Sequence, residues 1–282
     1  MTQAAAQSSA SASADVIVVG AGPAGSSAAY HMATLGLDVI LLEKQELGRD
    51  KVCGDGLTPS AVRELVSMGM DTTGWQRNRG LRVIGGGHLL HFPWPEQASF
   101  PSYGMARPRA LLDRDLAEHA AAAGARLLTG VTVTGPVTSP TGRVTGVEAR
   151  PTNRVAYPGI ERPTTFTAPL VVDAGGVSAR LATAVGRTKN ERRPMGVAVR
   201  AYFRSPRAKD AWMESRLELW DGTPGKSDLL PGYGWIWSVG EGLVNVGLGS
   251  VSSRAQATAI DYRAVFNRWM DNVPASWGFT KE

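Results

Sequence analysis

The chain has 282 residues, with 30 Lys and Arg against 25 Asp and Glu, so its formal net charge is +5. Its 43% hydrophobic and 20% charged residues are typical of a globular protein and exclude a disordered or coiled-coil chain. No apolar run approaches the roughly 20 residues that a membrane-spanning helix needs. Cys53 is the one cysteine, which excludes an intrachain disulfide and favours a reducing compartment such as the cytoplasm. The positive charge is spread along the chain, so we predict no nucleic-acid partner.

The N-terminal region begins with an Ala- and Ser-rich stretch that lacks the basic and apolar regions of a signal peptide. We therefore predict a disordered tail over residues 1–14. Val16–Val19 is a β-branched run typical of a buried parallel strand. A helix is predicted to follow as far as about Leu35, and Val39–Leu42 is predicted as the second strand. Together they form one βαβ unit.

Further helices are predicted at residues 59–68, 108–123, 178–185 and 260–271. The remaining pattern predicts strands, at 81–91 as a hairpin, at 131–172 as a meander, and at 196–203, 216–220, 235–239 and 243–248. This order predicts an α/β fold with two discontinuous domains. A Rossmann-like nucleotide-binding domain is predicted from 15–75 and 105–185, and a mostly antiparallel β domain for the substrate from 76–104 and 186–282.

A glycine motif of the form G-x-G-x-x-G stands between the first predicted strand and helix, at Gly20, Gly22 and Gly25. In a dinucleotide site the first Gly makes the turn, the second admits the pyrophosphate, and the third lets helix and strand pack closely. The helix N-terminus supplies N–H donors and a positive dipole for the phosphates. A Gly-rich packing turn without a ligand is the alternative. The predicted site also includes two residues within the motif, Pro23 and Ala24.

An acidic residue, Glu43, ends the second strand 18 positions after Gly25. Its carboxylate can accept both hydrogen bonds of an adenosine ribose diol and would repel a 2′-phosphate. We include Lys44, the next residue, in the predicted site. A second strand–acid–glycine segment, with Asp173 and Gly175, favours FAD over NAD, because a long dinucleotide uses another backbone segment beside the first βαβ unit. The alternative is an ordinary strand–turn–helix junction capped by Asp173.

These motifs, with three further segments, resemble the geranylgeranyl reductase family, whose members are FAD-dependent reductases of prenyl-chain double bonds. The further segments are Lys-x-Cys-Gly-Asp-Gly-Leu-Thr-Pro at 51–59, Arg-Pro-Arg at 107–109 with Asp113, and Pro-Gly-Tyr-Gly-Trp-Ile-Trp at 231–237. The resemblance runs from residue 15 to the end and is closest to the actinobacterial branch, which includes reductases of the menaquinone prenyl tail.

The resemblance implies FAD as the cofactor and an isoprenoid C=C bond as the target of a hydride from the reduced flavin. It implies a prenyl-lipid substrate and peripheral contact with the inner face of the membrane. With one dinucleotide fingerprint in the chain, the electron donor is left open between NADPH and a ferredoxin-like carrier.

The resemblance also implies further site residues. Cys53 and Gly54 lie on a loop that approaches the flavin in this fold, and Cys53 is a candidate proton donor. The alternative for Cys53 is a small buried hydrophobe. Arg109 is implied as a flavin-contacting arginine, with a solvated helix-end arginine as the alternative. We also include Val133 among the cofactor-binding residues.

Aromatic residues are concentrated in the C-terminal part of the chain. Trp235 and Trp237 are two apart on a predicted strand and so share one face. After a predicted turn at 231–234, which contains Tyr233, these three side chains could wall an elongated apolar substrate pocket; ordinary core packing is the alternative. The four histidines lack the spacing of metal ligands, so we predict no metal site.

Two departures from the family pattern stand out. Ser238 occupies a position where Pro is usual, and the Gly-Asp motif that family members carry further on is missing. We therefore interpret the chain as an N-terminal fragment or truncated gene product of a reductase. Two alternatives are an FAD-dependent monooxygenase or halogenase of the same fold, which lacks the Cys53 loop, and an inactive flavin-binding fragment.

Overall fold

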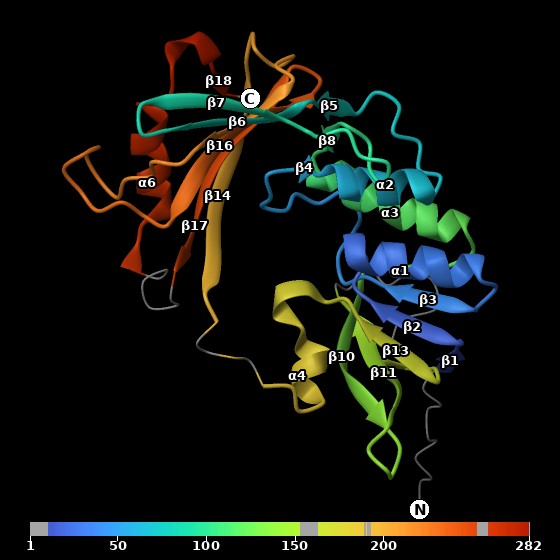
Figure 1. The fold of residues 1–282 in the computed structure, drawn as a ribbon. Coiled ribbons are helices and arrows are strands. Elements are labelled where there is room, and N and C mark those ends of the chain that lie inside the picture. The colour runs from blue at the N-terminus through green and yellow to red at the C-terminus, as the bar shows by residue number, and fades with distance from the viewer. Residues whose placement is uncertain (1–10, 153–162, 189, 191–192, 253–258, 282) are drawn as a thin grey trace, which may run out of the picture. The chain divides into compact units, whose positions relative to one another are not determined.

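The computed structural model describes residues 11–152, 163–188, 190, 193–252 and 259–281 (Figure 1). The chain forms two units, each built from two segments. Unit 1 comprises Met1–Asp50 and Ala110–Lys189, and unit 2 comprises Lys51–Arg109 and Asn190–Glu282.

The unit boundary differs from the predicted domain boundary at residues 51–75 and 105–109, which group with unit 2, and at 186–189, which group with unit 1. The cause is local hydrogen bonding. β4 (Gly56–Leu57) pairs with β8 (Gly104–Ala106), and Asp55 bonds to Asn245 within the same unit. The assignment of a cofactor role to one domain and a substrate role to the other stays a prediction.

Unit 1 is built on a parallel sheet in the order β13–β2–β3–β9 (Figure 1). Its strands are β2 (Val16–Val19), β3 (Val39–Leu42), β9 (Arg126–Leu128) and β13 (Leu170–Asp173). β2 and β3 are almost wholly buried, as expected for central parallel strands covered on both faces. On one face, α1 (Pro23–Thr34) and α3 (Arg109–Ala122) supply alanines that pack against alternate strand residues.

The other face of this sheet packs against a second sheet in the order β1–β12–β11–β10. Ile17, Ile40 and Leu42 form its core with Phe166 and Leu181. The elements are β10 (Val131–Thr138), β11 (Val144–Pro151), β12 (Thr164–Thr167), the 3-10 turn η1 (Gly176–Ser178) and α4 (Arg180–Ala184).

The predicted tail is wrong in its last residues. β1 (Ser11–Ser13) pairs in parallel with Thr165, Phe166 and Thr167 of β12. Ala and Ser have low β-propensity, so the composition does not predict this strand. β1 forms because the edge of β12 offers it backbone hydrogen-bond partners. Residues 1–10 lie outside the described part of the chain.

Unit 2 contains a seven-stranded mixed sheet in the order β18–β14–β17–β16–β15–β6–β7 (Figure 1). Its strands are β6 (Gly80–Gly85), β7 (His88–Pro93), β14 (Met195–Arg204), β15 (Trp212–Arg216), β16 (Gly232–Gly240), β17 (Leu243–Ser252) and β18 (Thr280–Lys281). α6 (Tyr262–Met270) covers one face, where Ile236, Val246 and Leu248 pack against Trp269. The opposite face carries Trp235 and Trp237.

A smaller sheet in unit 2 has the order β4–β8–β5, with β5 at Gln76–Asn78. α2 (Pro59–Ser67) begins after Thr58, whose side-chain oxygen accepts a hydrogen bond from the Ala61 N–H. A 3-10 turn, η2 (Ala275–Trp277), precedes β18.

Two predicted strand boundaries in unit 2 are wrong. The strand predicted at 216–220 is β15, at Trp212–Arg216, because its hydrogen bonds to β6 and β16 end there. The turn predicted at 231–234 is instead the start of β16. Gly232 stands there because a Cβ would lie 2.1 Å from the Gly249 carbonyl oxygen on β17. The glycine marks close strand packing, not a turn.

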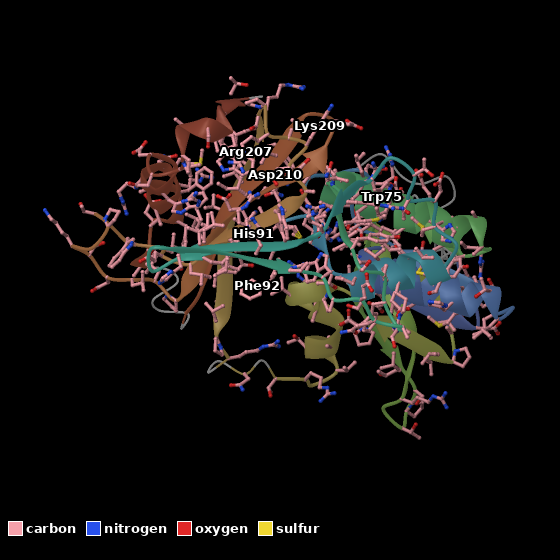
Figure 2. All side chains as sticks on the ribbon, turned by 45° about the horizontal axis from the view of Figure 1, so that its top comes forward. Trp75, His91, Phe92, Arg207, Lys209 and Asp210 are labelled. Carbon is pink, nitrogen blue, oxygen red and sulfur yellow. The ribbon has the colours of Figure 1, made fainter. Side chains whose placement is uncertain are left out.

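Charged side chains connect β6 and β15 in unit 2. Arg82 contacts Asp210 at 2.8 Å and Glu214 at 3.3 Å, and Arg207 contacts Asp210 at 2.6 Å (Arg207 and Asp210 are labelled in Figure 2). Burial raises the pKa of Asp210, but hydrogen bonds from Arg82 and Arg207 outweigh it and hold this pKa below its ordinary value. In the described part of the chain, no helix is long and apolar enough to cross a membrane.

Candidate functional site

The three glycines of the motif in unit 1 meet different surroundings. Gly20 has φ +101°, and a Cβ there would lie 2.6 Å from the Ala174 carbonyl oxygen. A Cβ on Gly25 would lie 1.8 Å from the Gly20 carbonyl oxygen, whereas one on Gly22 would meet nothing within 4 Å. Gly20 and Gly25 therefore allow close backbone packing, and Gly22 leaves open space at the start of α1. This is the arrangement that a pyrophosphate at a helix N-terminus requires.

Glu43 lies beside this turn at the end of β3. Its Oε2 atom accepts a hydrogen bond from the Ala21 N–H at 2.9 Å, and its Oε1 atom accepts one from the Gln45 N–H at 3.0 Å. Each carboxylate oxygen has a second acceptor position, so both can still receive a ribose hydroxyl. The residues present fit the adenosine end of a dinucleotide. Lys44 is exposed beside Glu43.

Asp173 ends β13 and begins the second glycine segment. Its Oδ1 atom accepts from the Gly175 N–H and its Oδ2 atom from the Ala182 N–H, each at 2.9 Å. Ala174 lies against Gly20 and Gly25, so this segment adjoins the first glycine turn. The contacts of Asp173 are those of the capping alternative. Val133 lies on β10 and packs against the core between the two sheets.

In unit 2, the Cys53 turn, residues 53–55, packs onto the aromatic face of the large sheet. The Gly54 carbonyl oxygen accepts a hydrogen bond from Trp237 Nε1. A Cβ on Gly54 would lie 2.7 Å from Trp237 Cζ2, so the ring excludes any larger residue. Cys53 is partly exposed, and its Sγ atom accepts the Asp55 N–H at 3.4 Å.

Asp55 is a site residue that the sequence analysis did not single out. It is 1% exposed. Its Oδ2 atom accepts hydrogen bonds from Tyr202 Oη at 2.6 Å and Asn245 Nδ2 at 2.7 Å, and its Oδ1 atom accepts the Arg109 N–H at 3.1 Å. Burial raises the pKa of Asp55 above its ordinary value, and these hydrogen bonds only partly oppose the rise. The available signal was a carboxylate between two glycines in the 51–59 motif.

Arg109 begins α3, as predicted, and is half-buried. Its N–H is one of the donors to Asp55, so the backbone of this position belongs to the same hydrogen-bonded group as the Cys53 turn. A contact between its guanidinium and a flavin stays a prediction.

The predicted aromatic residues form a row along β16. The ring centroids of Tyr233 and Trp235 are 5.9 Å apart, and those of Trp235 and Trp237 are also 5.9 Å apart with an interplanar angle of 23°. Trp235 and Trp237 are 5% and 7% exposed, whereas Tyr233 is 44% exposed. The two tryptophans therefore line the sheet core under the Cys53 turn, and Tyr233 is the member of the row that a ligand can reach. Among the described residues, no cluster of His, Cys, Asp or Glu is placed to hold a metal.

The family model described as "FAD binding domain" matches residues 13–257. The chain belongs to this FAD-binding family. FAD is therefore its cofactor, as the second glycine segment and the family resemblance predicted.

The curated relatives include two kinds of prenyl-lipid enzyme. The chain is 39% identical over 273 residues to a menaquinone reductase of Mycolicibacterium smegmatis, which covers 95% of this chain and 63% of the relative. It is 30% identical to digeranylgeranylglycerophospholipid reductase 1 of Methanosphaera stadtmanae, over 88% of this chain and 57% of that protein. These relatives confirm the predicted resemblance to geranylgeranyl reductases. The chain spans less than two thirds of the length of either.

Solved structures agree on the fold. A geranylgeranyl bacteriochlorophyll reductase-like protein from Thermoplasma acidophilum has a TM-score of 0.77 at 22% identity, over 96% of this chain and 65% of that one. The myxobacterial chondrochloren halogenase has a TM-score of 0.70 at 24% identity, over 92% of this chain and 58% of that one. Reductases and halogenases thus share this fold, so the fold alone does not distinguish them.

Proposed function

We propose that this chain is an FAD-dependent reductase that saturates isoprenoid C=C bonds in a prenyl lipid such as menaquinone or a geranylgeranyl lipid. The observation that carries the proposal is the 39% identity to a menaquinone reductase over 95% of this chain. The Cys53 turn supports it, because it places a partly exposed thiol beside an N–H donor.

The residues of unit 1 bind the cofactor in this proposal. Glu43 holds the ribose of the adenosine end, and the open backbone at Gly22 receives the pyrophosphate at the N-terminus of α1. Asp173 holds the second glycine segment in its turn. When bound and reduced, FAD supplies a hydride.

The residues of unit 2 act on the alkene. As one alkene carbon receives the hydride, the Cys53 thiol gives its proton to the other. The C=C π bond is lost, two C–H bonds form, and the thiolate takes a proton from water afterwards. The Asp55 N–H stabilises that thiolate. The exposed ring of Tyr233 contacts the apolar chain of the substrate. NADPH or a ferredoxin-like carrier reduces the flavin, and the enzyme meets its lipid at the inner face of the membrane.

An anaerobic absorbance experiment tests the proposal. The protein is loaded with FAD, reduced with dithionite without excess, and mixed with a geranylgeranyl lipid that lacks a quinone ring. We expect the absorbance of oxidised flavin to return. The matched control is the same lipid with a saturated tail, which offers no hydride acceptor. Equal reoxidation with both lipids, or with neither, would contradict the proposal.

The competing function is an FAD-dependent halogenase or monooxygenase, which the fold similarity to the chondrochloren halogenase favours. Such an enzyme consumes oxygen. Reoxidation that needs oxygen, with a halide or oxygen atom added to the product, would transfer the assignment to that class.

A further inference from the structure

The buried carboxylate of Asp55 joins three separate positions of unit 2 through one side chain. Tyr202 on β14 and Asn245 on β17 donate to Oδ2, and the N–H of Arg109 at the start of α3 donates to Oδ1. The Asp55 backbone is held as well, because its carbonyl oxygen accepts the Arg107 N–H at 3.0 Å. A carboxylate with this many donors costs less to bury than an unpaired one, although burial still raises its pKa.

The backbone of Asp55 has an uncommon conformation. Its φ is +63°, in the left-handed region that side chains other than Gly, Asn and Asp rarely adopt. This conformation forms the turn in which the Asp55 N–H contacts the Cys53 Sγ atom. A strained turn persists only where its surroundings fix it. The hydrogen bonds to the Asp55 carboxylate supply that restraint.

Asn245 connects this turn to the aromatic row. Its Oδ1 atom accepts from Trp235 Nε1 at 2.8 Å, which orients the amide so that its Nδ2 atom donates to the Cys53 carbonyl oxygen at 2.9 Å and to Asp55 Oδ2 at 2.7 Å. A flipped Asn245 amide would lose these hydrogen bonds, so its Nδ2 atom faces Asp55 and the residue at position 55 must present an acceptor to it. An Asn at position 55 can match only one side of this arrangement, because an amide nitrogen facing Asn245 would set donor against donor.

We propose that Asp55 is a positioning residue for the reduction, and that its carboxylate holds the Cys53 turn so that the thiol stays against the Asp55 N–H. This inference rests on the proposed function for its catalytic meaning. The geometry itself can be tested without a substrate, because Cys53 is the one cysteine in the sequence and reports directly on its own turn.

The test measures the rate of Cys53 alkylation by iodoacetamide across a range of pH in the FAD-loaded protein and in Asp55→Asn. Two effects oppose each other in the variant. Loss of a nearby negative charge lowers the pH midpoint of alkylation, whereas loss of the N–H contact raises it. If Asp55 positions the turn, loss of the N–H contact outweighs loss of the charge. The midpoint then rises, and alkylation below the midpoint slows by at most about fivefold, the factor expected for one lost hydrogen bond.

Tyr202→Phe is the second variant, because it removes one donor to the carboxylate and keeps both the charge and the ring. We expect its midpoint to move in the same direction by a smaller amount. Glu214→Gln is the control; it alters another buried carboxylate of unit 2, which contacts Arg82 and Arg216 instead of the turn. Its alkylation profile should match that of the parent.

A lowered or unchanged midpoint in folded Asp55→Asn would overturn the proposal, and so would an equal shift in Glu214→Gln. If Asp55→Asn does not fold, an unchanged midpoint in Tyr202→Phe overturns it.

In the absorbance assay with the geranylgeranyl lipid, we expect the maximal rate to fall about fivefold in Asp55→Asn, while the lipid concentration that gives half-maximal rate stays unchanged. If the midpoint shifts in Asp55→Asn but the parent protein reduces no alkene, the proposed function is refuted and the positioning of Cys53 by Asp55 stands.

Discussion

At the scale of single residues, glycines and one carboxylate shape the two turns of the candidate site. Gly22 leaves space, Gly54 makes room for a ring, and Glu43 fixes the neighbouring turn through the Ala21 N–H. The glycines and Glu43 could be predicted because their spacing carries their role. Asp55 could not be singled out, because its importance comes from Tyr202 and Asn245, residues 147 and 190 positions away.

Glu43→Ala should weaken FAD binding at least tenfold, because each charged hydrogen bond to the ribose contributes about 1.5–3 kcal/mol. Titration of the apoprotein with FAD, followed by flavin fluorescence, measures the dissociation constant. Glu46→Ala is the matched control, since Glu46 is an exposed carboxylate of the same loop that contacts Thr129. Equal affinities of Glu43→Ala and the parent would show that Glu43 does not bind the ribose.

Gly54→Ala should lower the free energy of unfolding by about 1–3 kcal/mol, because the added Cβ would lie 2.7 Å from the buried ring of Trp237. Gly56→Ala is the matched comparison. Its Cβ would meet the flexible end of Met213, which can move away, so its cost should be smaller. Urea unfolding followed by tryptophan fluorescence compares the two. A larger loss for Gly56→Ala would contradict the packing described for the Cys53 turn.

At the scale of elements, the two glycines at the start of α1 have different roles: Gly22 leaves space for the ligand, and Gly25 allows close packing. Gly22→Ala should keep the free energy of unfolding within about 0.5 kcal/mol of the parent, since a Cβ there meets nothing within 4 Å. FAD binding should nevertheless weaken, because the methyl group occupies space needed by the pyrophosphate. Gly25→Ala should destabilise the protein itself. Urea unfolding without FAD and titration with FAD distinguish the two effects; an undiminished FAD affinity in Gly22→Ala would count against this site.

The ion pairs of Asp210 with Arg82 and Arg207 should make stability depend on pH. The lowered pKa of Asp210 adds stability that is present above the ordinary value of 3.8 and is lost as the pH falls through the lower folded-state pKa. Asp210→Asn should therefore lose stability near neutral pH and flatten the acid limb of the stability curve. Urea unfolding at a series of pH values measures both. An unchanged slope below the ordinary Asp pKa would refute the role of Asp210.

Element types were more predictable from the sequence than the exact residues that they cover. Apolar runs and helical periodicity located β2, β3, α1 and α3, because those elements bury one kind of residue at a regular spacing. The start of β16 was misread because Gly232 suggested a turn, although it serves close contact with β17. The pairing of β1 with β12 is a tertiary contact, which local composition does not reveal.

At the scale of the whole molecule, two comparisons support the proposed reduction of an isoprenoid double bond. The family match supplies the cofactor, and the similarity to a menaquinone reductase supports the substrate class. The aromatic row could be located from the sequence, but its burial could not. Trp235 and Trp237 line the core, whereas Tyr233 is exposed, so substrate contact by Tyr233 stays a prediction.

The most direct measurement is the mass of a prenyl lipid after anaerobic incubation with the protein, FAD and excess dithionite. The proposed function predicts a gain of two hydrogen atoms for each bond reduced, with no gain in a parallel sample of Cys53→Ala that retains bound FAD. An unchanged lipid in the parent sample would contradict it, and so would a product that forms only with oxygen and carries an added oxygen or halogen atom.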